Sequence, residues 1–184
     1  YSAAQEIASE ALAKHYKEKK NFPINIRAIL EEKSIALHEM NLNTDIGLRI
    51  RKINGYLQKT SDDKWEIYVH NGDSEFSKRY IMAHEFSYYL LYENLGRKEL
   101  WTPTHHCVDP LFAEHGEDLI CDVIASFILF PPELVLDSLS KYKNIMEKKS
   151  QYPMDAFEWL RILGQHAQIS SYFTIISYQH LKFY

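Results

Sequence analysis

The chain has 184 residues, of which 46% are hydrophobic and 25% are charged. These are ordinary proportions for a soluble globular protein, and the length is enough for one domain with a substantial core. The aromatic content of 14% is high and predicts a core rich in large rings. The formal net charge of -4 argues against binding to nucleic acid through bulk positive charge, so no nucleic-acid partner is expected.

Several features of the sequence predict a soluble, cytoplasmic protein without a membrane partner. No run of apolar residues is long enough to span a bilayer. Only Cys107 and Cys121 could form a disulfide, and the apolar helical run around Cys121 favours a reduced chain. The first residues lack the charged start and apolar block of a signal peptide. A chain that begins at Tyr1 rather than Met is expected to be a fragment.

The first quarter of the chain predicts two helices and a strand. Apolar residues at helical spacing indicate a helix over 2–19, which Phe22-Pro23 ends. Asn25 is a typical N-cap and predicts a second, short helix after it. The segment 34–39 is expected to form a first short strand.

The next stretch predicts a small antiparallel sheet of three or four strands. The segment 47–53 alternates between apolar and polar residues, and Asn54-Gly55 is a strong signal for a hairpin turn. A second turn is expected at 61–63. It is followed by the alternating, half-buried strand 65–70.

The rest of the chain predicts helices. A central helix runs over 74–94, and a second long helix starts at Leu111 or Glu117 and ends at Pro131-Pro132. The remaining segments are a loop over 97–110, a short helix over 133–139, a charged linker over 142–153, and helices over 154–165 and 170–181. The prediction is a single α+β domain over 1–184, with the segments 1–40, 47–72, 74–130 and 131–184.

The central helix carries a His-Glu pair in its middle. His84 and Tyr88 are four residues apart and share one face of the helix, and Glu85 lies one position further round. This pattern differs at one place from the His-Glu-x-x-His motif of zinc peptidases, in which the glutamate takes a proton from the attacking water. His84 and Tyr88 are therefore candidate zinc ligands, and Glu85 is the candidate catalytic residue.

A third ligand is expected on the next long helix. Asp118 and Asp122 are also four residues apart, so their carboxylates face the same way. Asp118 is the tentative ligand, and Asp122 is the candidate partner that orients the imidazole of His84. The spacing leaves open whether another histidine replaces a ligand, and the candidates in or near the intervening loop are His105, His106 and His115.

The same residues also have simpler explanations. A His-Glu pair occurs on helices by chance, Tyr88 could belong to the core, and Asp118 and Asp122 could be an acidic first turn favoured by the helix dipole. Neutral imidazole is a good zinc ligand, whereas a phenol with a pKa of about 10 must first lose its proton. The tyrosine at position 88 therefore predicts a zinc site that is weak or absent.

Taken together, the motifs and their order resemble the ImmA/IrrE family of metallopeptidase-like proteins. The segment 79–91 is similar to the family's motif helix, Arg-Phe-Thr-x-Ala-His-Glu-x-x-His-Tyr-x-Leu. The segment 118–131 resembles the next helix of the family, Glu-x-x-Ala-Asn-x-Phe-Ala-x-x-Leu-Leu-Met-Pro. The match covers nearly the whole chain, because three further segments correspond in order: 22–26, 65–71 and 168–170.

The resemblance implies a zincin-like (gluzincin) α+β fold with a small antiparallel sheet and a central pair of helices that carry the active-site motif. It implies zinc as the cofactor, His84 as first ligand, Glu85 as general base, Tyr88 in place of the second ligand, Asp118 in place of a Glu ligand, and Asp122 at an Asn or Asp position. Family members include proteases that cut a helix-turn-helix repressor of phages or mobile elements.

Three interpretations of the sequence follow. The first is an active zinc endopeptidase with an altered ligand set, and the implied substrate is a helix-turn-helix repressor. The second is a catalytically silent relative that keeps the fold and binds a regulatory protein partner. The third, which the order of the motifs disfavours, is an unrelated helical domain with a coincidental motif.

Overall fold

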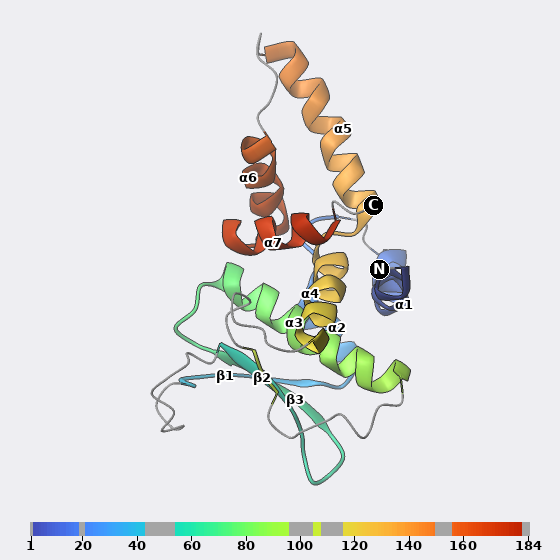
Figure 1. Cartoon of the computed structure of the whole chain (residues 1–184), viewed down its shortest axis with the longest axis vertical. Coiled ribbons are helices and arrows are strands. Elements are labelled where there is room, and N and C mark those ends of the chain that lie inside the picture. Colours follow the sequence, from blue (N-terminus) through green and yellow to red (C-terminus); the bar gives the residue numbers. More distant parts are fainter. Residues whose placement is uncertain are drawn as a thin grey trace.

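The computed structural model describes residues 2–18, 21–42, 54–95, 105–107, 116–149 and 156–181, and these form an α+β arrangement. In Figure 1, α3 (Glu75–Leu95) lies along one face of a small sheet, and α4 (Gly116–Leu129) packs on α3 from the side away from the sheet. The other helices are α1 (Ser2–Glu18), α2 (Ile26–Glu32), α5 (Pro132–Lys149), α6 (Ala156–Ala167) and α7 (Ser171–Leu181).

The ends of several helices follow from local signals in the sequence. The side chain of Asn25 accepts a hydrogen bond from the backbone N–H of Ala28, which confirms the predicted cap of α2. Ser170 accepts a hydrogen bond from the N–H of Phe173 in the same way, just before α7 begins. Among the described helices, none is by itself long and apolar enough to cross a membrane, although α4 and the start of α5, bent by 50° at the break between them, pass that test as a pair.

The prediction for the segment after Pro132 is wrong. We expect a short helix over 133–139 and a charged linker over 142–153, but α5 continues without a break to Lys149. Between Glu133 and Lys149 the sequence contains neither Gly nor Pro, and Lys, Glu, Leu and Met are good helix formers. Charge alone does not interrupt a helix, and the high helix propensity of these residues explains why α5 continues to Lys149.

The sheet has the strand order β1-β3-β2-β4 and is mixed rather than antiparallel. Strand β1 (Ala36–Met40) pairs parallel to β3 (Trp65–His70), while β2 (Gly55–Lys59) pairs antiparallel to both β3 and β4 (His105–Cys107). Side chains alternate with the same period in either strand direction. The pattern of β1 therefore could not reveal that it runs parallel to its neighbour.

The turn between β2 and β3 confirms the predicted turn at 61–63. The N–H of Thr60 bonds to the carbonyl of Lys64 at 2.8 Å, and Asp63 has a positive φ of 64°. Gly55, which we expect in a hairpin turn, is instead the first residue of β2. The preceding strand predicted over 47–53 lies outside the described residues.

The core forms between the sheet, α3 and α4. Strands β2 and β3 bury one face, and α3 is buried along the continuous run 80–88 because it has the sheet on one side and α4 on the other. Helices α1 and α7 also pack on α4. The buried apolar side chains that join these elements include Leu12, Leu57, Ile67, Val69, Ile81, Phe86, Ile124, Ile128 and Phe173.

Gly55 lets β2 approach α3 closely. A Cβ atom at position 55 would lie 2.4 Å from Cγ2 of Ile81 and 3.0 Å from the carbonyl oxygen of Tyr68. Both neighbours are fixed, since Ile81 is buried in α3 and Tyr68 belongs to the adjacent strand.

We therefore expect Gly55→Ala to lower the free energy of unfolding by about 1–3 kcal/mol through overpacking, measured by urea unfolding. Gly72→Ala is the matched control. The three atoms nearest to a Cβ at position 72 all belong to the ring of His70, with Nε2 at 2.8 Å, and this side chain can rotate at the cost of the hydrogen bond that its Nδ1 accepts from the N–H of Leu42. An equal loss of stability in both variants would contradict the close approach at Gly55.

Candidate functional site

The predicted site residues of α3 lie in the most buried part of that helix. His84 is 3% exposed and Glu85 is fully buried, and both lie among apolar neighbours such as Met82 and Phe86. A polar group taken out of water in this way costs free energy unless it finds a partner. His84 finds its partner on α4.

His84 is held by Asp122. Its Nδ1 lies 2.8 Å from Oδ1 of Asp122, and the hydroxyl of Tyr80 donates a hydrogen bond to the same oxygen, also at 2.8 Å. Burial by itself would lower the pKa of His84, but the hydrogen bond and charge of Asp122, with the charges of Glu85 and Asp118, raise it above its ordinary value. Asp122 thus fixes the orientation of the ring and favours its protonated form.

The second ring nitrogen of His84, Nε2, does not share the contact that Nδ1 makes with Asp122. Within the part of the chain that the structure describes, Nε2 of His84 is buried and has no hydrogen-bond partner. When the ring is neutral with its proton on Nδ1, facing the carboxylate, Nε2 keeps a lone pair, and this is the arrangement of a metal-ligating histidine. This contact agrees with the sequence prediction that Asp122 orients His84.

Tyr88 contacts the second predicted carboxylate. Its hydroxyl donates a hydrogen bond to Oδ1 of Asp118, and its ring meets the His84 ring edge-on with centroids 5.4 Å apart. Burial raises the pKa of the Tyr88 phenol far above its ordinary value, and the nearby Cys121 and Asp118 raise it further. The phenol is therefore protonated at neutral pH.

The two contacts between α3 and α4 step along the helices in opposite directions. The first contact joins His84 to Asp122. The second joins Tyr88, one helical turn after His84 on α3, to Asp118, which lies one turn before Asp122 on α4. This register requires antiparallel helices whose i, i+4 faces meet. The spacing of both pairs in the sequence is the signal that places all four side chains together.

Glu85 lies beside this cluster, on the side of α3 that faces β2. Its Cγ would be 3.6 Å from a Cβ atom placed at Gly55, and its charge raises the pKa of both His84 and Tyr88. The carboxylate is therefore close enough to both side chains to influence their ionisation. Its position does not by itself assign a reaction.

The donor atoms of the cluster do not fit a stoichiometric zinc site. Zinc binds neutral imidazole, thiolate, carboxylate or another deprotonated oxygen. His84 offers Nε2, but Tyr88 keeps its proton and gives it to a hydrogen bond with Asp118, so the second and third ligand positions satisfy each other. Among the described residues, no group of three or more His, Cys, Asp or Glu side chains is arranged to hold a metal ion.

Sequence reasoning missed two members of the cluster. Tyr80 lies one turn before His84 on the same face of α3, so the i, i−4 spacing would have indicated it. Cys121, a buried thiol, lies three residues after Asp118 and raises the pKa of Tyr88. Of the open histidine candidates, His105 and His106 belong to β4 by their backbone, opposite Leu57 and Tyr56, and His115 lies outside the described residues.

Comparison with known proteins does not place the chain in a family. No model of a known protein family matches the sequence, and no curated protein matches it.

The hydroxyl of Tyr80 is expected to stabilise the fold through its contact with Asp122. Tyr80→Phe keeps the ring, which stacks on Phe173 of α7 at 4.0 Å, but removes a hydrogen-bond donor to a buried carboxylate. We expect the free energy of unfolding to fall by about 1–3 kcal/mol.

The matched control for Tyr80→Phe is Tyr89→Phe. Tyr89 is a half-buried tyrosine of the same helix that packs through its ring against Trp65 and Phe86. Urea unfolding of both variants tests the contact, and a loss for Tyr80→Phe no larger than that for Tyr89→Phe would show that the hydroxyl contributes nothing.

Proposed function

We propose that the protein has a peptidase-like, zincin-related architecture and acts by binding a protein partner rather than by hydrolysis. The observation that carries this proposal is the hydrogen bond from Tyr88 to Asp118. It occupies the two side chains that a zinc peptidase of this kind would use as its second and third ligands. A hydrogen bond between α3 and α4 would then replace the bridge that a metal ion provides.

The physical reason is the cost of making a phenolate at this site. Tyr88 is buried and lies among carboxylates, and both conditions oppose loss of its proton. A metal ion would have to supply that free energy and also break the contact with Asp118. The protonated pair needs no such compensation, so the cluster is stable as a structural link.

The sequence resemblance to the ImmA/IrrE family suggests the partner class. Because proteases of that family cut helix-turn-helix repressors of phages and mobile elements, we propose a repressor of this kind as the bound protein. We also place the protein in the cytoplasm, where such a repressor works and where the thiol of Cys121 would stay reduced.

A second candidate function is a zinc-dependent endopeptidase, and one observation favours it. His84 has its Nδ1 on Asp122 and its Nε2 without a partner among the described residues, which is the preparation that a zinc-bound histidine requires. Glu85 lies next to it as the residue that could accept a proton from water. Metal content and cleavage distinguish the two functions.

The purified protein is expected to hold less than one equivalent of zinc, and Tyr88→His is expected to raise that occupancy. The substitution supplies a neutral imidazole and frees Asp118 from its hydrogen bond. Metal analysis by mass spectrometry after dialysis measures both forms. Tyr89→His, the same change one position round the helix, is the control and should leave the zinc content unchanged. Full stoichiometric zinc in the unaltered protein would refute the proposal.

The repressor experiment tests binding against cleavage. The unaltered protein is expected to bind a helix-turn-helix repressor whose gene lies next to its own, as calorimetry would measure. It is also expected to leave that repressor uncleaved in the presence of zinc. Cleavage that disappears in Glu85→Gln, with the fold retained by circular dichroism, would instead establish the endopeptidase. If the unaltered protein neither bound nor cut the repressor, the repressor would be excluded both as a bound partner and as a substrate.

A further inference from the structure

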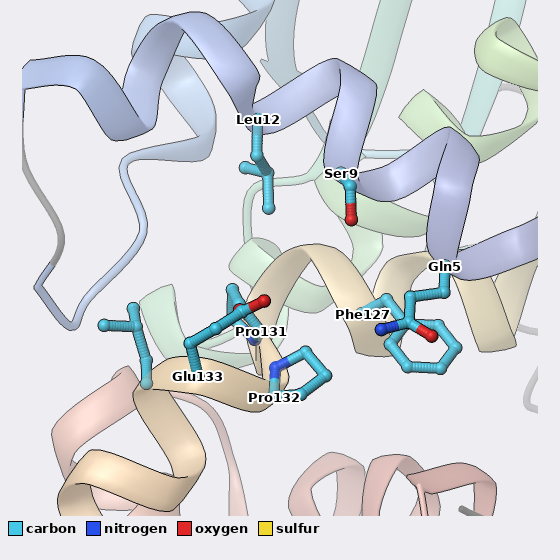
Figure 2. A pocket seen from close by; sticks show the side chains of 8 residues that line it. Gln5, Ser9, Leu12, Phe127, Pro131, Pro132 and Glu133 are labelled. Atoms are coloured by element: carbon cyan, nitrogen blue, oxygen red, sulfur yellow. The ribbon is translucent and has the colours of Figure 1, made fainter.

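A cavity lies where α1 meets the corner between α4 and α5, at the opposite end of α4 from the carboxylates of the candidate site. Figure 2 shows the side chains of Gln5, Ser9 and Leu12 pointing from α1 toward this corner. The lining residues are Gln5, Ser9, Leu12, Phe127, Pro131, Pro132, Glu133 and Leu134.

The lining is divided into an apolar floor and a polar rim. Leu12, Phe127, Pro131 and Leu134 are buried and form the floor, whereas Gln5, Ser9 and Glu133 are more exposed. In Figure 2 the carboxylate of Glu133 extends from the start of α5 toward α1. An apolar floor with a few converging polar groups is the usual composition of a binding pocket.

The size of the cavity limits what it can hold. Its volume is about 180 Å³. A water molecule needs about 10–15 Å³ by the same kind of measure, so the cavity is much larger than a water site. Pockets for drug-sized ligands and cofactors span about 300–1,000 Å³. One large side chain of another protein therefore fits the cavity better than a cofactor does.

Among the described side chains, those that line the cavity carry negative charge only. Glu133 is on the rim, and none of these described lining residues is Lys or Arg. Glu6 and Glu10 are exposed on α1 and lie on the face next to that of Gln5 and Ser9. A neighbouring cavity that shares Leu134 has both signs of charge, since Asp137 and Lys141 pair there at 2.6 Å, so it selects no charge.

These observations select one occupant. An arginine side chain combines a long apolar stem with a planar cation, so its stem would cover Leu12 and Pro131 while its guanidinium met the Glu133 carboxylate. The side-chain oxygens of Gln5 and Ser9 are further acceptors, and the ring of Phe127 offers a surface that attracts cations. A neutral aromatic or aliphatic side chain would leave the rim carboxylate without a counter-charge.

We infer that the cavity between α1 and the α4–α5 corner is an anchor site for an arginine side chain of a protein partner. This inference rests on the proposed function, in which the protein binds another protein, and it adds the chemistry by which the partner is held. A repressor that binds DNA carries basic side chains of the required kind.

The test uses a defined probe and the full chain. An uncharged, end-blocked pentapeptide with one central arginine is titrated into the isotope-labelled protein and followed by NMR. The amide signals of residues 5–12 and 131–134 are expected to shift. The same peptide with citrulline, which keeps the stem and loses the charge, should bind at least about fivefold more weakly.

Three variants locate the site. Glu133→Gln is expected to weaken the arginine peptide about tenfold, because a charge-assisted hydrogen bond is lost. Ser9→Trp, a change at an exposed position, should fill the cavity and abolish binding. Asp62→Asn is the matched control, since it removes an exposed carboxylate in the turn between β2 and β3, and it should bind like the unaltered protein.

Several results would overturn the anchor site. These are equal affinity for the arginine and citrulline peptides, binding unaffected by Glu133→Gln, or no shift of the amides that line the cavity. Because the peptide reports on the cavity without the repressor, this failure is separate from failure of the proposed function. A repressor that still binds the Glu133→Gln variant with full affinity would leave the proposed function intact and exclude only the arginine anchor.

Discussion

The carboxylate of Asp122 is the group on which the centre of this molecule depends. An ionised carboxylate buried without partners would cost several kcal/mol, and this one accepts hydrogen bonds from Tyr80 and from His84. Both donors come from one face of α3. The need to pair this carboxylate therefore holds α3 against α4 at this point, and the second contact, between Tyr88 and Asp118, requires the two helices to be antiparallel.

The second contact, between Tyr88 and Asp118, bears on whether this helix pair can bind a metal ion. The same two positions could hold a metal ion if both side chains were ready to ligate, but a protonated phenol and a carboxylate satisfy each other instead. In the proposed function, the residue type at position 88 thus decides between a metal site and a structural link. His84 and Glu85 keep the positions that a catalytic role would need, which is why two functions compete.

Helix α4 joins the candidate functional site to the cavity proposed as an arginine anchor. Asp118 and Asp122 lie in its first half, whereas Phe127 lies near its end, in the cavity bordered by α1 and the start of α5 (Figure 2). The break at Pro131-Pro132 forms the corner that makes this cavity, because proline cannot continue the hydrogen bonding of α4 but suits the first turn of α5. The proposed partner site is thus separate from the buried cluster.

The sequence by itself determined the α+β class, the extents of α3 and α4, the cap at Asn25 and the turn at 61–63, because each depends on side chains close together along the chain. It also placed His84, Tyr88, Asp118 and Asp122 in one cluster, since spacing of four fixes a helix face. The helix propensities of residues 133–149 also predict the full length of α5, but their charges led us to expect a linker there. Only the tertiary structure decided that β1 runs parallel to β3, that the Tyr88 hydroxyl bonds to Asp118, and that burial raises the pKa of this phenol. Strand direction leaves no trace in an alternating pattern, and a pKa depends on burial and on carboxylates that are distant in the sequence.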